Sequence, residues 1–191
     1  MDAIILAGGQ NRRFQSHKAL ARIGGRTIIE KMLEVIQQCF QKVYITTNTP
    51  DLFFNLGVPL IGDVVDQRGP MTGIYSSFVG TASRELFFVA CDMPFIKKEV
   101  VELIRKTFRG QDAVLPIYRG VPQPLLAAYS HNVLPVLESL MKGNKRALWD
   151  LLKVIAAEYI PEKEISAADH EGRSFININT LEEYRDHVVR I

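Results

Sequence analysis

Short continuous apolar runs alternate along the chain with segments whose apolar residues recur three or four positions apart. The first pattern predicts a buried strand and the second an amphipathic helix. Ala3–Ala7 is the first such run. Helical spacing follows it at Ile28, Ile29, Met32, Leu33, Ile36 and Phe40. Thr27, with Glu30 three residues later, is a capping-box pattern and predicts where this helix begins.

The same alternation continues through the first half of the chain. Further strands are predicted at Val43–Thr47, Leu60–Gly62 and Leu86–Cys91, and helices at Thr72–Ala82 and Val100–Phe108. Continuous apolar strands that alternate with helices predict a sheet covered on both faces. We therefore expect a three-layer α/β, Rossmann-like fold with a mostly parallel central sheet and ligand sites at the carboxyl ends of its strands.

The second half of the chain has a less regular pattern. Strands are predicted at Ala113–Pro116, Leu125–Tyr129, Ala156–Ile160 and Phe175–Ile178, and helices at Val133–Met141, Ala147–Leu152 and Leu181–Val189. The acidic segment Pro161–Gly172 is predicted to be a surface loop. No long polar linker divides the 191 residues. We expect one domain over 1–191, with a nucleotide-binding half at about 1–110 and an acceptor-binding half at about 111–191.

Charge narrows the range of partners. The net charge of +2 comes from 23 basic and 21 acidic residues, and it is too small to predict a nucleic-acid or membrane surface. A small molecule is the expected partner. The first apolar run is too short for the apolar part of a signal peptide and no basic segment precedes it, so a cytoplasmic protein is expected. Cys39 and Cys91 fit no metal motif, which agrees with a reducing compartment. Both are predicted to be buried packing residues.

A glycine-rich segment directly after the first predicted strand has the composition of a phosphate loop. It reads Leu6-Ala7-Gly8-Gly9-Gln10-Asn11-Arg12-Arg13-Phe14 and is followed by Lys18. Glycines permit positive φ and a close approach of backbone N–H groups to phosphate, while Arg and Lys supply positive charge. The spacing matches neither GxxxxGK[ST] nor GxGxxG. By itself, a Gly-Gly turn followed by basic residues is more often an ordinary surface loop.

Several motifs in order along the chain resemble those of the MobA-like nucleotidyltransferases. The phosphate segment resembles the LAGG–Arg–Lys signature of that family. Gly69–Ile74 is similar to its GPLAGI motif, and Ala90–Phe95 to its PCDMPF motif. Gln123-Pro124 occupies the place of a His-Pro or Gln-Pro pair, and Phe175–Thr180 resembles the closing FxNxNT motif. In this last motif and in its short length, the chain resembles the molybdenum cofactor guanylyltransferases within the family.

This resemblance implies a set of site residues. Nucleotide contacts are implied for Leu6, Ala7, Gly8, Gly9, Lys18, Asp63, Gly73, Asp92, Asn177 and Asn179, and catalytic roles for Arg13, Lys18 and Asp92. Asp66 is an alternative to Asp63, because the loop gap can be placed differently. Asp92 follows an apolar strand and is the implied ligand of Mg²⁺, which prefers oxygen donors and often takes only one or two carboxylates.

The resemblance also implies the reaction. GMP would pass from GTP to molybdopterin or to molybdenum-bound molybdopterin, with release of pyrophosphate, and cofactor-delivery or acceptor proteins are possible further partners. Two alternatives within the enzyme class stay open, a cytidylyltransferase for the same pterin and a sugar-phosphate nucleotidyltransferase, because a phosphate loop does not read the base. A nucleotide-binding regulator without turnover is the alternative outside it.

Overall fold

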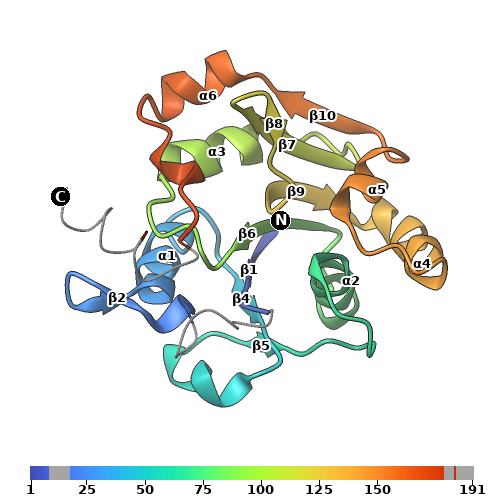
Figure 1. Ribbon diagram of the computed structural model, residues 1–191, viewed down its shortest axis with the longest axis horizontal. Helices are drawn as coiled ribbons and strands as arrows, with labels where there is room; N and C mark the ends of the chain where they lie inside the picture. The colour runs from blue at the N-terminus through green and yellow to red at the C-terminus, as the bar shows by residue number, and fades with distance from the viewer. Residues whose placement is uncertain (9–17, 179–182, 184–191) are drawn as a thin grey trace.

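The computed structural model describes residues 1–8, 18–178 and 183, and a central sheet of eight strands organises this part of the chain (Figure 1). The strands are β1 (Asp2–Leu6), β4 (Val43–Thr46), β5 (Leu60–Ile61), β6 (Glu85–Ala90), β7 (Ala113–Tyr118), β8 (Val121–Pro122), β9 (Leu126–Ser130) and β10 (Ala157–Ile160). Their order across the sheet is β10-β7-β9-β6-β1-β4-β5, and β8 pairs with β7. The first strand of the sequence therefore lies inside the sheet.

The pairing within the sheet is mostly parallel. The strands β5, β4, β1 and β6 pair parallel with one another in that order, and β10 pairs parallel with β7. Strand β9 is antiparallel to both β6 and β7. In the register of the central strands, Leu6 lies opposite Thr46 on one side and Ala90 on the other. The carboxyl ends of β1, β4 and β6 therefore meet at one edge.

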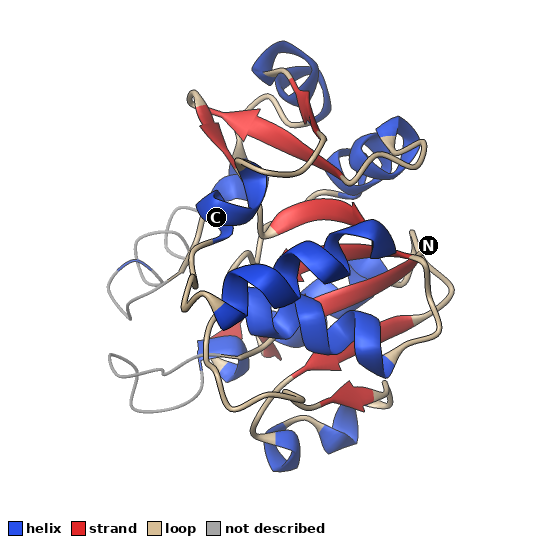
Figure 2. Cartoon of the chain, turned by 90° about the vertical axis from the view of Figure 1, so that its right-hand side faces the viewer, coloured by secondary structure: helices blue, strands red, loops and turns tan. Residues whose placement is uncertain are grey.

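In the described part of the chain, six helices cover the two faces of the sheet. They are α1 (Ile28–Ile36), α2 (Pro70–Gly80), α3 (Lys98–Thr107), α4 (Leu134–Lys142), α5 (Leu148–Leu152) and α6 (Glu162–Ala168). Helices α1, α3 and α6 pack on one face, and α2, α4 and α5 on the other (Figure 1). The turned view in Figure 2 shows helices lying across the strands.

Alternate residues of the central strands enter different cores. Ala3 and Ile5 pack with the first set of helices, whereas Ile4 packs with the second. All three side chains are fully buried. Continuous apolar strands are the expected sequence of such a doubly covered sheet, and the three-layer α/β prediction is confirmed.

The smaller elements were not predicted from the sequence. They are a hairpin of β2 (Arg22–Ile23) and β3 (Arg26–Thr27) and the 3₁₀ turns η1 (Lys18–Leu20), η2 (Pro50–Leu52), η3 (Phe54–Leu56), η4 (His131–Val133) and η5 (Arg173–Phe175). They are too short to give a periodic hydrophobic pattern. Across the described residues, none of the helices combines the length and the apolar composition that crossing a bilayer requires.

The prediction of a loop at Pro161–Gly172 is wrong, because α6 lies within it. Pro161 precedes the helix in an extended conformation, and Glu162 and Glu164 lie in the first turn. Acidic residues there are favoured by the partial positive charge of a helix N-terminus. Ile165 is fully buried and anchors the single apolar face. The abundance of acidic residues therefore marked the start of a helix.

The prediction of a strand at Phe175–Ile178 is also wrong. Phe175 ends η5, and its N–H donates to the carbonyl of Gly172 at 3.1 Å. The N–H of Ile178 donates to the carbonyl of Asp92 at 2.9 Å. The backbone groups are thus used by a turn and by a loop, and no sheet partner is needed. The helix predicted at 181–189 lies outside the described residues except for Glu183.

The capping box that begins α1 is formed as predicted. The N–H of Glu30 donates to Thr27 Oγ1 at 3.3 Å, and the N–H of Thr27 donates to Glu30 Oε2 at 2.7 Å. The bond from the Thr27 N–H is the main reason why the pKa of the Glu30 carboxyl lies below its ordinary value. Two otherwise unpaired N–H groups are satisfied together.

Replacing Thr27 by Ala should destabilise the protein by about 1 kcal/mol, because the helix loses its N-cap acceptor. Urea denaturation followed by circular dichroism measures the free energy of unfolding. Thr27→Ser keeps the hydroxyl and is the matched control, expected to be close to wild type. Equal stability of the Ala and Ser variants would contradict the role of the cap.

Candidate active site

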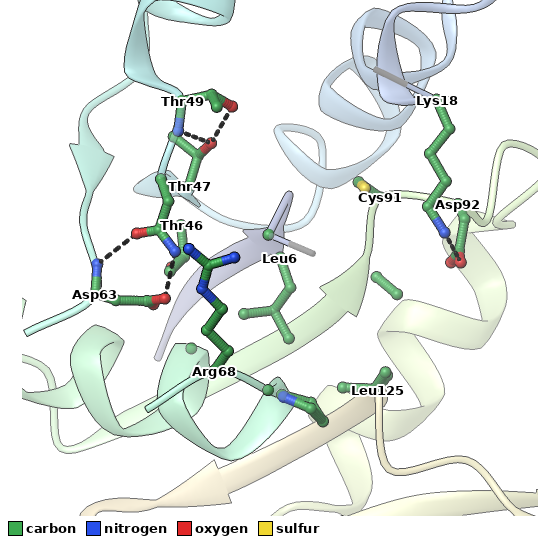
Figure 3. A pocket seen from close by; sticks show the side chains of 16 residues that line it. Leu6, Lys18, Thr46, Thr47, Thr49, Asp63, Arg68, Cys91, Asp92 and Leu125 are labelled. Carbon is green, nitrogen blue, oxygen red and sulfur yellow. Dashed lines mark hydrogen bonds and ion pairs between the residues drawn. The ribbon is translucent and has the colours of Figure 1, made fainter. Parts of the chain in front are cut away.

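A cavity of about 710 Å³ lies at the edge where the central parallel strands end. It is lined by six residues that the sequence singled out, namely Leu6, Gly8, Lys18, Asp63, Gly73 and Asp92. In Figure 3, Lys18 and Asp92 lie on one side and Asp63 on the other, with Leu6 and Arg68 between them. The structure thus brings together residues that are up to 86 positions apart (from 6 to 92).

Backbone hydrogen bonds extend the sheet to the floor of the cavity. The N–H of Ala7 donates to the carbonyl of Thr46 at 2.9 Å, and the N–H of Cys91 donates to the carbonyl of Leu6 at 3.1 Å. The N–H of Thr47 donates to the carbonyl of Ile61 at 2.8 Å. The polar residues that follow each strand are therefore held in fixed register with one another.

Lys18 and Asp92 form an ion pair at one end of the cavity. Lys18 Nζ lies 2.6 Å from Asp92 Oδ2, and the two side chains are 20% and 16% exposed. Lys18 begins η1, where Ala19 is fully buried and fixes the turn against α1. Asp92 directly follows β6. A partly buried cation at the end of a sheet is well placed to receive a phosphate oxygen.

The second oxygen of Asp92 fits a divalent cation. Oδ1 is buried and accepts no hydrogen bond from the described residues. A buried carboxylate oxygen without a partner is costly and calls for a ligand. Mg²⁺ commonly takes one or two carboxylates and completes its shell with phosphate and water. Within residues 1–8, 18–178 and 183 no group of three His, Cys, Asp or Glu forms an all-protein metal cage.

Asp63 is held at the opposite end of the cavity by Asn48. The side-chain amide of Asn48 donates to the carboxylate of Asp63, and its Oδ1 accepts the N–H of Asp63 at 3.2 Å. Asn48 follows β4 and Asp63 follows β5, so the pair joins two neighbouring strand ends. Asp66, the alternative to Asp63, is exposed and does not line the cavity.

The N-terminus of α2 lies at the same space. Gly69, Pro70 and Gly73 line the cavity, and Gly69 precedes the helix without a side-chain cap. Its φ of 139° and ψ of 172° belong to a region that is essentially restricted to glycine. A helix N-terminus favours an anion, because its free N–H groups and the helix dipole act together.

Two residues add to this picture in ways that the sequence did not predict. Gly8 does not have a positive φ, and a Cβ placed on it would meet no atom within 4 Å. Gly8 contributes backbone that no side chain covers to the cavity wall. Arg68 also lines the cavity (Figure 3). It lies in the irregular loop between β5 and α2, where no periodicity identifies it.

The remaining predicted residues have different positions. Ala7 is buried behind the cavity wall, and Asn177 is exposed and does not line the cavity. Gly9, Arg13 and Asn179 lie outside the described residues. Lining residues without a prediction also come from the ends of strands, and they are Thr46, Thr47, Thr49, Ala90, Cys91 and Leu125.

Comparison with known proteins assigns this architecture. Residues 3–162 match the model of the MobA-like NTP transferase domain. The chain belongs to the MobA-like NTP transferase family. It is a nucleotidyltransferase. The molybdenum cofactor guanylyltransferase of Desulfosudis oleivorans is 33% identical over 188 residues, which cover 96% of this chain and 93% of that protein.

Solved structures share the fold of this MobA-like chain. The molybdopterin-guanine dinucleotide biosynthesis protein A of Archaeoglobus fulgidus has a TM-score of 0.85 at 27% identity, covering 100% of this chain and 98% of its own. The 4-diphosphocytidyl-2C-methyl-D-erythritol synthase of Anaerococcus prevotii has a TM-score of 0.72 at 13% identity, covering 100% and 96%. Because proteins with different names share this architecture, the fold alone does not select base or acceptor.

Both cysteines of this family member are buried, as predicted. Burial, followed by the neighbouring Asp92 carboxylate, raises the pKa of the Cys91 thiol to about 12. Burial also raises the pKa of Cys39 to about 11. Neither thiol ionises near neutral pH, so Cys91 lines the cavity as a neutral group and is unsuited to act as a nucleophile.

Gly73→Ala should weaken nucleotide binding with little effect on stability. A Cβ at Gly73 would lie 3.0 Å from Leu6 Cδ2, so Leu6 must move at the cavity wall. A loss of about 1 kcal/mol of binding free energy at the displaced Leu6 would raise the Kd of a nucleoside triphosphate about fivefold. Isothermal titration calorimetry with each of the four triphosphates measures this change.

Gly80→Ala is the matched control on the same helix. Its Cβ would lie 3.0 Å from Ile61 Cγ2, and Ile61 does not line the cavity. We expect Gly80→Ala to bind the nucleotide as wild type does. Equal affinities in the two variants would show that close packing of α2 on Leu6 does not shape the site.

Proposed function

We propose that this nucleotidyltransferase transfers GMP from GTP to a molybdopterin-type molybdenum cofactor and releases pyrophosphate. The observation that carries the proposal is one cavity in which the cation of Lys18, the N-terminus of α2 and an unpartnered oxygen of Asp92 converge. These groups are complementary to a triphosphate with its metal. The names of the relatives supply the guanine and the pterin.

The proposed reaction is a direct displacement. An oxygen of the acceptor's terminal phosphate forms a bond to the α-phosphorus of GTP, and the bond from that phosphorus to the bridging oxygen of the β-phosphate breaks. The electron pair of the broken bond leaves with pyrophosphate. An acceptor phosphate is already ionised near neutral pH, so no strong general base is required, and the neutral thiol of Cys91 agrees with a mechanism without a covalent enzyme intermediate.

Charge neutralisation and positioning are the work that the chain itself would perform. Lys18 would exchange its ion pair with Asp92 for the phosphates, and Asp92 would then hold Mg²⁺ through its carboxylate. When bound, Mg²⁺ supplies charge stabilisation for the phosphate oxygens. Asp63, fixed by Asn48, would contact the nucleoside at the other end of the cavity. Gly9, Arg13, Asn177 and Asn179 stay predicted contacts.

The choice of base and acceptor is tested by a direct assay. Purified protein with Mg²⁺ and molybdopterin is offered GTP, CTP, ATP or UTP, and pyrophosphate release and product mass are measured. We expect GTP to be preferred and the product to contain one GMP. A preference for CTP would replace the proposal by a cytidylyltransferase. If product forms only when a sugar phosphate is supplied, the acceptor is a sugar phosphate and the proposed pterin acceptor is wrong. Nucleotide binding without pyrophosphate from any pair would favour a regulator.

Lys18→Ala and Asp92→Ala should each reduce kcat at least about 100-fold, as removal of one group that stabilises developing charge commonly does. Steady-state pyrophosphate release measures this loss, and circular dichroism checks the fold. The exposed Lys153 and the half-buried Asp150 form a pair at α5, 3.7 Å apart, outside the cavity lining. Lys153→Ala and Asp150→Ala should therefore retain wild-type activity. Near-normal turnover in a folded Lys18 or Asp92 variant would rule out the assigned role.

A further inference from the structure

The C-terminal part of the described chain is attached to both ends of the loop that carries Asp92. That loop runs from Asp92, directly after β6, to Lys97, directly before α3. At its first residue, the carbonyl of Asp92 accepts the N–H of Ile178 at 2.9 Å. At its last residue, the N–H of Lys97 donates to Ser174 Oγ at 3.0 Å. Residues 169–178 therefore span the loop from end to end.

Asp169 is the centre of the second attachment. It is 2% exposed, and its Oδ1 lies 2.8 Å from Lys97 Nζ. Its Oδ2 accepts the N–H of Ser174 at 2.7 Å. Burial favours the neutral acid, but the hydrogen bonds from Lys97 and Ser174 outweigh it and hold the pKa of Asp169 below its ordinary value. The carboxylate is thus ionised at neutral pH and binds the loop and the turn at once.

Two ring contacts pack the turn η5, one against the loop and one against β7. The guanidinium of Arg173 lies 4.9 Å from the ring centroid of Phe95, which is within the loop. The ring of Phe175 stacks on Tyr118 of β7 with centroids 4.3 Å apart. Gly172 has a φ of +65°, and a Cβ there would lie 2.1 Å from Tyr118 Oη. Only glycine allows the chain to approach β7 this closely.

We propose that Lys97, Asp169 and Ser174, named here the brace, position the carboxylate of Asp92 for metal and nucleotide. The inference rests on the proposed role of Asp92. None of the three residues lines the cavity, so they are positioning residues. A reacting group displaced by about 1 Å can lose about two orders of magnitude in rate. The brace fixes the Lys97 end of this six-residue loop, the Ile178 N–H holds the Asp92 end, and the two attachments together limit such displacement.

A brace that serves stability alone would give a different outcome from one that positions Asp92. If it were only structural, removing it would lower the melting temperature and leave kcat unchanged in the folded protein. If it positions Asp92, kcat falls while the KM for GTP changes little, because the phosphate contacts of Lys18 and α2 are retained. The binding of Mn²⁺ beside Asp92 would weaken as well.

The test compares Lys97→Met with Lys97→Arg and with Lys106→Met. Lys97→Met removes the cation that pairs with Asp169, and Lys97→Arg keeps it. Lys106→Met removes an exposed cation from the far end of the same helix, where it pairs with Glu102 at 3.6 Å. Ser174→Ala, a smaller change that removes the hydroxyl that accepts the Lys97 N–H and hydrogen-bonds Asp169, serves if Lys97→Met does not fold. Asp92→Asn is the reference for loss of the carboxylate.

Three measurements are made on each variant of the full chain. Pyrophosphate release gives kcat and the KM for GTP, electron paramagnetic resonance gives the Kd of Mn²⁺ with GTP present, and hydrogen exchange gives the protection of peptides covering residues 92–97 and 178. We expect Lys97→Met and Ser174→Ala to lose about tenfold or more in kcat, with KM within about twofold. Mn²⁺ binding and loop protection should fall in parallel. Lys97→Arg should recover most of the loss, and Lys106→Met should match wild type.

The outcomes separate the brace from the function it serves. Wild-type kcat and Mn²⁺ affinity in folded Lys97→Met and Ser174→Ala, with Asp92→Asn inactive, would overturn the brace and leave the role of Asp92 standing. Full activity in Asp92→Asn would overturn both. If the wild type turns over no GTP at all, the Mn²⁺ and hydrogen-exchange results still decide whether the brace holds Asp92.

Discussion

The parallel pairing of β1 with β4 on one side and β6 on the other is the constraint on which the site depends. Its register places Leu6 opposite both Thr46 and Ala90, so the residues after each strand emerge at the same height. A shift of one residue would turn every strand side chain to the other face of the sheet. Two fully buried cores, one on each face, exclude such a shift.

The polar groups at this edge are held as pairs that a ligand can separate. Lys18 pairs with Asp92, and Asn48 pairs with Asp63. All four line the cavity, so a charged ligand that enters it can replace one partner of each pair. The N-terminus of α2 also lines the cavity and presents the positive end of its helix dipole to an anion. The site is therefore preorganised in its backbone and adaptable in its side chains.

Sequence reasoning succeeded where periodicity and local chemistry agree. The central strands, the helices at their flanks and the capping box at Thr27 follow from patterns that span a few residues each. The placement of Lys18, Asp63 and Asp92 in one cavity follows from strand order, since residues after parallel strands share an edge. The resemblance to the family supplied the identities of those residues, which spacing could not.

The same reasoning failed where the decisive contacts are distant in sequence. An acidic segment read as a loop contains α6, and a run read as a strand holds Ile178, whose N–H bonds to Asp92 across 86 positions. The pairing of Lys97 with Asp169 spans 72 positions, and no local sequence pattern predicts it. Arg68 was not predicted either, because it lies in an irregular loop that has no hydrophobic periodicity.

The predicted nucleotide half and acceptor half of the chain are in contact with each other at the loop that carries Asp92. The family model ends at residue 162, yet the loop that carries Asp92 is held at both ends by residues from 169 to 178. Asp169 can do this because Lys97 and Ser174 offset the cost of burying its charge. Without those residues, the loop keeps its internal turn from Ile96 to Met93, the ion pair of Asp92 with Lys18 and the packing of its apolar side chains. The carboxylate that the proposed chemistry needs is thus presented by the first half of the chain and fixed by its last described segment.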